Sequence, residues 1–80
     1  MVDPASIESS IRAGLACTHC EVRGDGAHFE ATVISDRFVG QSMVKQHQMV
    51  YATLGNRMEA EIHALALRTL TPDQWQSVSR

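Results

Sequence analysis

Apolar residues recur every four positions near the start of the chain and later alternate with polar ones. Ile7, Ile11 and Leu15 follow an Asp-Pro pair, which suits a helix start because Asp caps free amides and Pro fits the first turn. The four-residue spacing places these three side chains on one face of a helix. The pattern therefore predicts a helix over residues 4–16.

The next segment has the two-residue period of strands. Residues 17–23 predict a short strand with Val22 pointing inward, and the Gly-Asp-Gly run at 24–26 supplies the residues of a tight turn. Residues 28–35 predict the clearest strand, because two sets of side chains alternate along it. The inward set is Phe29, Ala31 and Val33, and the outward set is Glu30, Thr32 and Ile34.

A helical period returns after a loop at residues 36–40. Phe38 is expected to fill the core as the chain leaves the sheet, and Gly40 permits the turn into a helix over residues 42–54. A short helical turn at 57–61 follows. The stripe expected on the core side comprises Met43, His47, Val50, Tyr51, Leu54 and Met58, and Met49 is also expected to be core.

The last part of the chain predicts a strand and a capped helix. Residues 62–69 form the third strand, and Thr-Pro-Asp-Gln at 71–74 starts a helix, with Gln74 at the capping-box position. Trp75 and Val78 are expected to anchor this helix to the body, with Trp75 in the core.

The predicted order α-β-β-α-(α)-β-α indicates a single α+β domain over residues 1–80. The hairpin makes the first two strands antiparallel, and the intervening helix returns the chain so that the second and third strands are parallel. A three-stranded mixed sheet with helices on one face is the economical packing.

The composition of the chain argues against several classes of function. The 80 residues carry 7 Lys+Arg against 9 Asp+Glu, and the cations form no stripe of the kind that binds nucleic acid. No stretch is apolar over the length of a membrane span, and the N-terminus lacks the pattern of a secretion signal, so we expect a cytoplasmic protein. No set of nucleophile, base and orienting residue is visible, so we expect no enzymatic activity. The oligomeric state of the free chain is left open.

Two histidines are predicted at the same end of the sheet. His28 opens the second strand and His63 opens the third, and those strands run in one direction. Exposed imidazoles are good metal ligands, but two are too few for a four-coordinate site, so a partner would supply the rest. The alternative is that His63 caps a strand edge and His28 is a solvated turn residue. From the residues alone, this second interpretation is favoured.

Cys17 and Cys20 form a C-x-x-C motif at the opposite end of the sheet from the two histidines. It offers a thiol redox pair or part of a zinc site. A zinc site usually needs a second ligand pair, and a thioredoxin-like motif opens a helix rather than entering a strand. We therefore favour one core cysteine and one incidental one over a functional pair.

The helix over residues 42–54 carries a lone histidine and few cations. His47 on an apolar face is more often a core residue than a ligand. Lys45 and Arg57 are the only hint of a nucleic-acid recognition helix, and two such cations usually mark a solvated face.

Five segments together resemble the BolA family over about residues 7–76. They are DGAHF, SDRFVG, VKQHQMVYATL, IHAL and TLTPDQW, and DGAHF is most similar to the bacterial IbaG-type branch. The resemblance implies a fold similar to the class II KH module. It also implies an adaptor that binds a monothiol glutaredoxin and shares a 2Fe–2S cluster in iron–sulfur assembly or iron sensing.

The resemblance further assigns roles to residues. The family's cluster ligand in the third strand matches His63, and the loop ligand between the first two strands is nearest to His28 here. In most members that ligand stands a few residues earlier, where this chain has Asp25. The glutaredoxin and glutathione would supply the remaining thiols, and the isolated chain is expected to hold no cofactor.

Transcriptional regulation is the other activity implied by the resemblance. Residues 42–61 would contact DNA, through candidate residues Lys45, Gln46, His47 and Arg57. The family often has Arg where this chain has Gln46, which weakens the DNA hypothesis for this chain.

Overall fold

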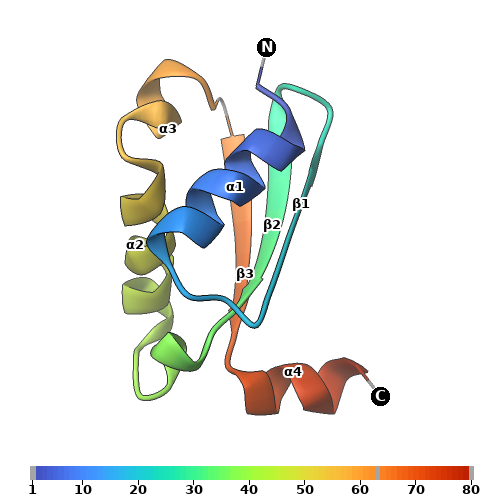
Figure 1. Cartoon of the computed structure of the whole chain (residues 1–80), viewed down its shortest axis with the longest axis vertical. Coiled ribbons are helices and arrows are strands. Elements are labelled where there is room, and N and C mark those ends of the chain that lie inside the picture. Colours follow the sequence, from blue (N-terminus) through green and yellow to red (C-terminus); the bar gives the residue numbers. More distant parts are fainter. Residues whose placement is uncertain (1, 63, 80) are drawn as a thin grey trace.

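The computed structural model describes residues 2–62 and 64–79, which form a three-stranded sheet and its helices (Figure 1). The predicted order of elements is confirmed, and the boundaries move by a few residues. The helices are α1 (Pro4–Gly14), α2 (Met43–Leu54), α3 (Arg57–Ala60) and α4 (Pro72–Ser79), with a 3₁₀ turn at Asp36–Phe38. The strands are β1 (His19–Gly24), β2 (His28–Ile34) and β3 (Ala64–Leu70).

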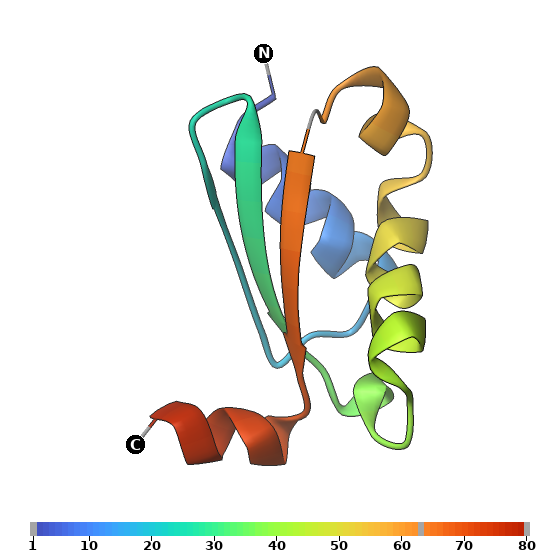
Figure 2. The ribbon, with the colours of Figure 1, turned by 180° about the vertical axis from the view of Figure 1, so that it is seen from behind.

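The sheet has the predicted mixed topology, with β2 in the centre. β1 and β2 pair antiparallel, and β2 and β3 pair parallel. α1 and α2 cover one face, whereas the opposite face has no helix across most of its length (Figure 2). α4 projects from the end of β3 below the sheet (Figure 2). The α+β class with helices on one face is therefore confirmed.

The core lies between the covered face of the sheet and the two helices. Phe38 is fully buried where the chain leaves β2, and Gly40 has a φ of 79°, which glycine adopts without strain. Both expectations for this loop are confirmed. The main buried cluster also contains Ile7, Ile11, Leu15, Cys20, Val22, Phe29, Ala31, Val33, Val50, Leu54 and Ile62.

The core stripe of α2 differs from the predicted one. Gln46, with 7% of its surface exposed, is buried together with Val50 and Leu54, whereas His47 is only partly buried. Gln46 is stabilised there because Thr69 donates a hydrogen bond of 2.7 Å to its Oε1, and its Nε2 donates to the carbonyls of Phe38 and Gln41. Compared with the predicted stripe, the buried face of α2 is therefore turned so that Gln46 faces Thr69 of β3.

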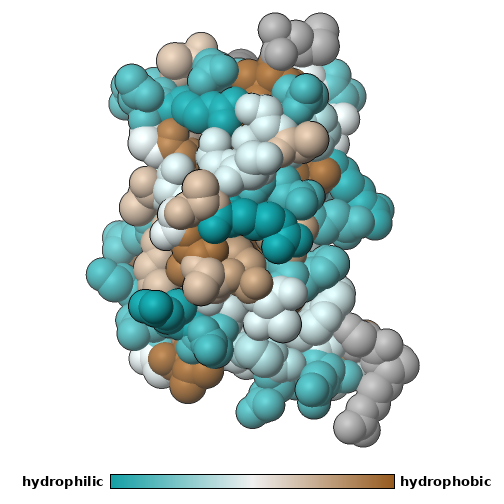
Figure 3. All heavy atoms as spheres, viewed as in Figure 1, coloured by the Kyte–Doolittle hydropathy of each residue, from teal (hydrophilic) through white to brown (hydrophobic). Residues whose placement is uncertain are grey.

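This rotation leaves part of the predicted stripe in solvent. Met43 is 59% exposed and Tyr51 is 37% exposed, so their assignment to the core was wrong. Met49 and Met58 do pack against the core, as predicted. Val44, the second residue of α2, and Val39 in the preceding loop are also more than 60% exposed. Hydrophobic (brown) atoms are visible at the surface where α2 begins (Figure 3).

The last helix is attached less firmly than predicted. Trp75 is only partly buried, and its ring stacks on that of His19 with centroids 5.0 Å apart and planes inclined by 16°. Val78 is 52% exposed, so it is not the buried anchor that was expected. The expectation that Trp75 lies in the core was wrong, because α4 turns away from the sheet after its first residues (Figure 1). The stack on His19 holds α4 at the end of the otherwise uncovered face.

Candidate functional site

The candidate site lies at the end of the sheet where the β1–β2 turn and the start of β3 meet. We call it the turn end, and it comprises residues 24–28 and Ala64. α3 lies at this end as well (Figure 1). His28 pairs in parallel register with Ala64, the residue directly after His63. The described residues therefore confirm that β2 and β3 begin side by side.

Of the two predicted ligands, only one is described. His28 is exposed at the first position of β2. His63 lies outside the described residues, between the buried Ile62 and the partly buried Ala64. Its role as a ligand stays a prediction, and so does that of His28.

Asp25 has a clear structural role in the turn. Its Oδ1 accepts hydrogen bonds of 3.0 Å from the backbone amides of Ala27 and His28. These bonds stabilise the charged carboxylate, so the backbone amide of His28 and then that of Ala27 lower the pKa of Asp25. The same carboxylate sets the backbone of His28 at the start of β2.

Cys17 and Cys20 lie at the other end of the sheet, as predicted, because Cys20 pairs with Val33 near the end of β2. Both are free thiols. Cys20 is 3% exposed and belongs to the core, and Cys17 is partly buried with its Sγ donating to the carbonyl of Leu15. Burial raises the pKa of Cys17 and raises that of Cys20 to about 12, so neither is a ready thiolate at neutral pH.

The four candidate DNA-contacting residues do not form one surface. Lys45 is exposed in the first turn of α2. Gln46 is buried with both amide atoms hydrogen-bonded inside the protein, so we withdraw it as a DNA contact. Arg57 bonds to Glu61 at 2.9 Å and to Ser6 and Ser10 of α1, which holds its guanidinium against the protein. The partly buried His47 has an Nε2 with no hydrogen-bond partner among the described residues.

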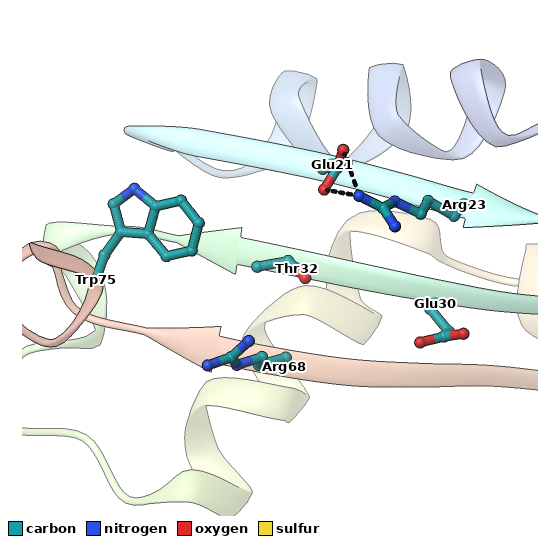
Figure 4. Close-up of a pocket in the computed structure, with 6 residues that line it drawn as sticks. All are labelled: Glu21, Arg23, Glu30, Thr32, Arg68 and Trp75. Atoms are coloured by element: carbon teal, nitrogen blue, oxygen red, sulfur yellow. Dashed lines mark hydrogen bonds and ion pairs between the residues drawn. The ribbon is translucent and has the colours of Figure 1, made fainter. Parts of the chain in front are cut away.

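A groove on the uncovered face of the sheet was not anticipated from the sequence. Its volume is about 230 Å³, and side chains from all three strands and from α4 line it (Figure 4). Arg68 points toward Trp75 at one end, and Arg23 is paired with Glu21 at 3.3 Å. The lining residues are Glu21, Arg23, Glu30, Thr32, Arg68 and Trp75. The outward alternation of the strands predicts such polar side chains, but not the tryptophan beside them.

The described residues contain neither a cluster of metal-binding side chains nor a membrane-spanning helix. Within residues 2–62 and 64–79, no group of three or more His, Cys, Asp or Glu side chains is placed to hold a metal ion. None of the described helices combines the length and apolar character that crossing a membrane requires.

Comparison with known proteins decides the family. A family model described as BolA-like protein matches residues 6–74. The chain belongs to the BolA family. The match spans the sheet, the helices on its covered face and the start of α4, so it includes the turn end and the C-x-x-C motif.

Relatives and solved structures agree with this assignment. The chain is 33% identical over 82 residues to a protein of Escherichia coli K12 named DNA-binding transcriptional regulator BolA, covering 90% of this chain and 78% of that protein. It is 38% identical over 85 residues to Protein BOLA2 of Arabidopsis thaliana, covering 100% and 90%. The structure of a bolA protein homologue from Coxiella burnetii matches with a TM-score of 0.83 and 40% identity, covering 95% and 99%. Assignment to the IbaG-type branch stays a prediction.

Proposed function

We propose that this BolA-family chain is a non-enzymatic adaptor that binds a monothiol glutaredoxin in the cytoplasm. In this proposal, His63 and His28 ligate a 2Fe–2S cluster that the two proteins share in iron–sulfur assembly or iron sensing. The observation that carries it is the register of His28 with Ala64, which sets the exposed imidazole of His28 beside the residue that follows His63.

His28 is a better second ligand than Asp25. An exposed imidazole offers a nitrogen donor, and imidazoles replace thiolates on one iron of Rieske-type clusters. The Oδ1 of Asp25 is engaged by two backbone amides, so moving this carboxylate to iron would undo the turn that positions His28. Thiols of the glutaredoxin and of glutathione would complete the ligand set. When bound, the cluster would supply one-electron redox chemistry or be passed on intact.

The test is visible circular dichroism of the chain mixed with a cluster-loaded monothiol glutaredoxin. We expect a spectrum that differs from that of the glutaredoxin alone, and we expect His63→Ala and His28→Ala each to change it. Asp25→Asn should leave it unchanged, because an amide oxygen still accepts the two turn hydrogen bonds. His19→Ala is the matched control, since His19 pairs with Ile34 at the opposite end of the sheet.

Different failures have different meanings. No change in the spectrum on mixing would refute the glutaredoxin partnership. A changed spectrum that survives His28→Ala but is lost in a variant of Asp25 would refute the choice of second ligand. A spectrum of the mixture that is unchanged by His63→Ala would refute His63 as a ligand of the shared cluster.

DNA binding is the second candidate, because the Escherichia coli relative is named a DNA-binding regulator. In this chain it would depend on the exposed Lys45, since Gln46 is buried and Arg57 is held by α1 and Glu61. The neighbouring exposed side chains Val39 and Val44 are poor contacts for phosphates. A titration against duplex DNA at two salt concentrations tests it. Binding that weakens steeply with salt and is lost in Lys45→Ala would support this function.

A further inference from the structure

The uncovered face of the sheet ends against a wall that α4 forms. One row across the three strands comprises His19, Ile34 and Leu70, which are paired in register. The ring of Trp75 stacks on that of His19. Because side chains alternate along a strand, Ile34 points to the face opposite that of the core residue Val33. Ile34 is nevertheless fully buried, so the start of α4 closes this end of the face and holds the indole there.

The next row of the same face carries the polar side chains nearest to this wall. It comprises Glu21, Thr32 and Arg68, which are paired in register. Arg68 is exposed and points toward Trp75, whereas Glu21 is engaged by Arg23 at 3.3 Å (Figure 4). Within residues 2–62 and 64–79, neither the guanidinium of Arg68 nor the hydroxyl of Thr32 has a hydrogen bond or an ion pair. A cation and a hydroxyl thus lie beside an aromatic ring, ready to bind a ligand.

The charges of the groove limit the kind of ligand that fits it. One row farther from α4, Arg23 and Glu30 are paired in register, so Glu30 lies about 7 Å farther along β2 than Thr32. The lining therefore holds two cations and two carboxylates. A phosphate chain or another multiply charged anion would meet both carboxylates and lacks the clustered cations that it needs. A ligand with a single negative charge, placed at Arg68, avoids this repulsion.

We propose that this groove binds a small aromatic carboxylate. Its flat ring packs on the part of Trp75 that lines the groove, and its carboxylate accepts two parallel hydrogen bonds from the guanidinium of Arg68 and one from the hydroxyl of Thr32. The volume of about 230 Å³ is smaller than the about 300–1,000 Å³ of pockets for drug-sized molecules, so the ligand has a single ring. The site is independent of the turn end, because neither His28 nor Asp25 lines it.

The experiment titrates the full chain with benzoate, which carries the ring and the charge together. Trp75 is the only tryptophan of the chain, so its fluorescence reports on this groove alone. We expect a saturable change in fluorescence with a Kd on the order of 1 mM, as suits a ligand of this size in an open groove. In nuclear magnetic resonance spectra, we expect the amide shifts to change along the outward residues of the three strands and at the start of α4. These shifts come from the wild-type chain and do not depend on any variant folding.

Matched probes and a matched pair of variants separate the two halves of the ligand. Benzamide keeps the ring without the charge, and acetate keeps the charge without the ring, so each should bind at least about tenfold more weakly than benzoate. Arg68→Gln should weaken benzoate binding about tenfold and leave benzamide binding unchanged. Arg37→Gln is the control, because Arg37 is also exposed but lies in the 3₁₀ turn and does not line the groove. Far-ultraviolet circular dichroism checks that both variants fold.

Several results would overturn the proposal. One is the absence of a saturable change with benzoate at concentrations far above the expected Kd. Others are benzamide binding as tightly as benzoate, or Arg68→Gln binding benzoate as tightly as the wild type. Amide shifts that change at the turn end or on α2 instead of around the groove would place the binding elsewhere. Phenyl phosphate binding more tightly than benzoate would overturn the choice of a singly charged carboxylate.

Discussion

The two ends of the sheet are built in different ways. At the turn end, Asp25 and His28 are exposed, and backbone amides hold the carboxylate that shapes the turn. At the opposite end, Cys20 and Phe38 are buried and side-chain packing holds the chain. Exposed side chains are free to change without opening the core, whereas buried ones are not. One small domain therefore exposes polar side chains at one end and keeps packed apolar ones at the other.

The largest loss of stability should come from removing a buried side chain at the end of the sheet opposite the turn end. Phe38→Ala removes a fully buried ring, so we expect a loss of about 3–5 kcal/mol in the free energy of unfolding measured in urea. The neighbouring Val39→Ala is the control, because Val39 is 63% exposed and should change stability by less than about 0.5 kcal/mol. Equal effects of the two substitutions would contradict the assignment of this end to the core.

A smaller effect should follow from removing the buried amide of α2. Gln46→Leu removes the amide that accepts from Thr69 and donates to the carbonyls of Phe38 and Gln41, so we expect a loss of about 1–3 kcal/mol in unfolding free energy. Gln48→Leu on the exposed face is the matched control. Adding Thr69→Val to Gln46→Leu should lose less than the sum of the two single changes, because they share one hydrogen bond. If the losses of the two single variants simply add in the double variant, the hydrogen bond between Gln46 and Thr69 does not stabilise the fold as described.

The smallest effect on stability is expected from a substitution at the turn end, and it depends on pH. Because the pKa of Asp25 is lower in the folded chain than in the unfolded one, its contribution is complete above the unfolded value and is lost as pH falls through the folded value. Asp25→Ala should therefore be less stable than the wild type at neutral pH, and the gap should close in acid. Thermal unfolding across pH measures this. A gap of the same size at neutral and at acid pH would argue against the carboxylate as its source.

Local patterns in the sequence were sufficient for most of the fold. Period-two alternation in β2 and the Gly-Asp-Gly turn define the hairpin, and one connecting helix makes β2 and β3 parallel. The alternation ends at Ile34, which was expected to point outward but is fully buried. The placement of His28 at the start of β2 follows from the same reasoning. These features depend on neighbours in sequence or on general rules of chain connection, so a single sequence carries them.

Features that depend on distant partners were missed. Gln46 is buried only because Thr69, 23 residues later, supplies a hydrogen bond, and no helical pattern contains that information. Trp75 was assigned to the core because of its size, yet it stacks on His19 at the sheet end, and the direction in which α4 leaves β3 decides this. Asp25 was weighed as a ligand because it stands near the place where most family members carry the loop ligand. Its two hydrogen bonds to the turn amides became visible only in three dimensions.

The hydrogen bond from Arg12 to the carbonyl of Cys20 also affects how the molecule behaves among copies of itself. β1 is an edge strand of the open sheet, as β3 is on the other side, and exposed edge strands are templates on which foreign chains add and aggregates grow. The guanidinium of Arg12 lies at this edge and already donates to the carbonyl of Cys20, which an incoming strand would need as an acceptor. It also adds a positive charge that such a strand would have to displace. Arg12 of α1 thereby opposes aggregation of the domain through the edge of β1.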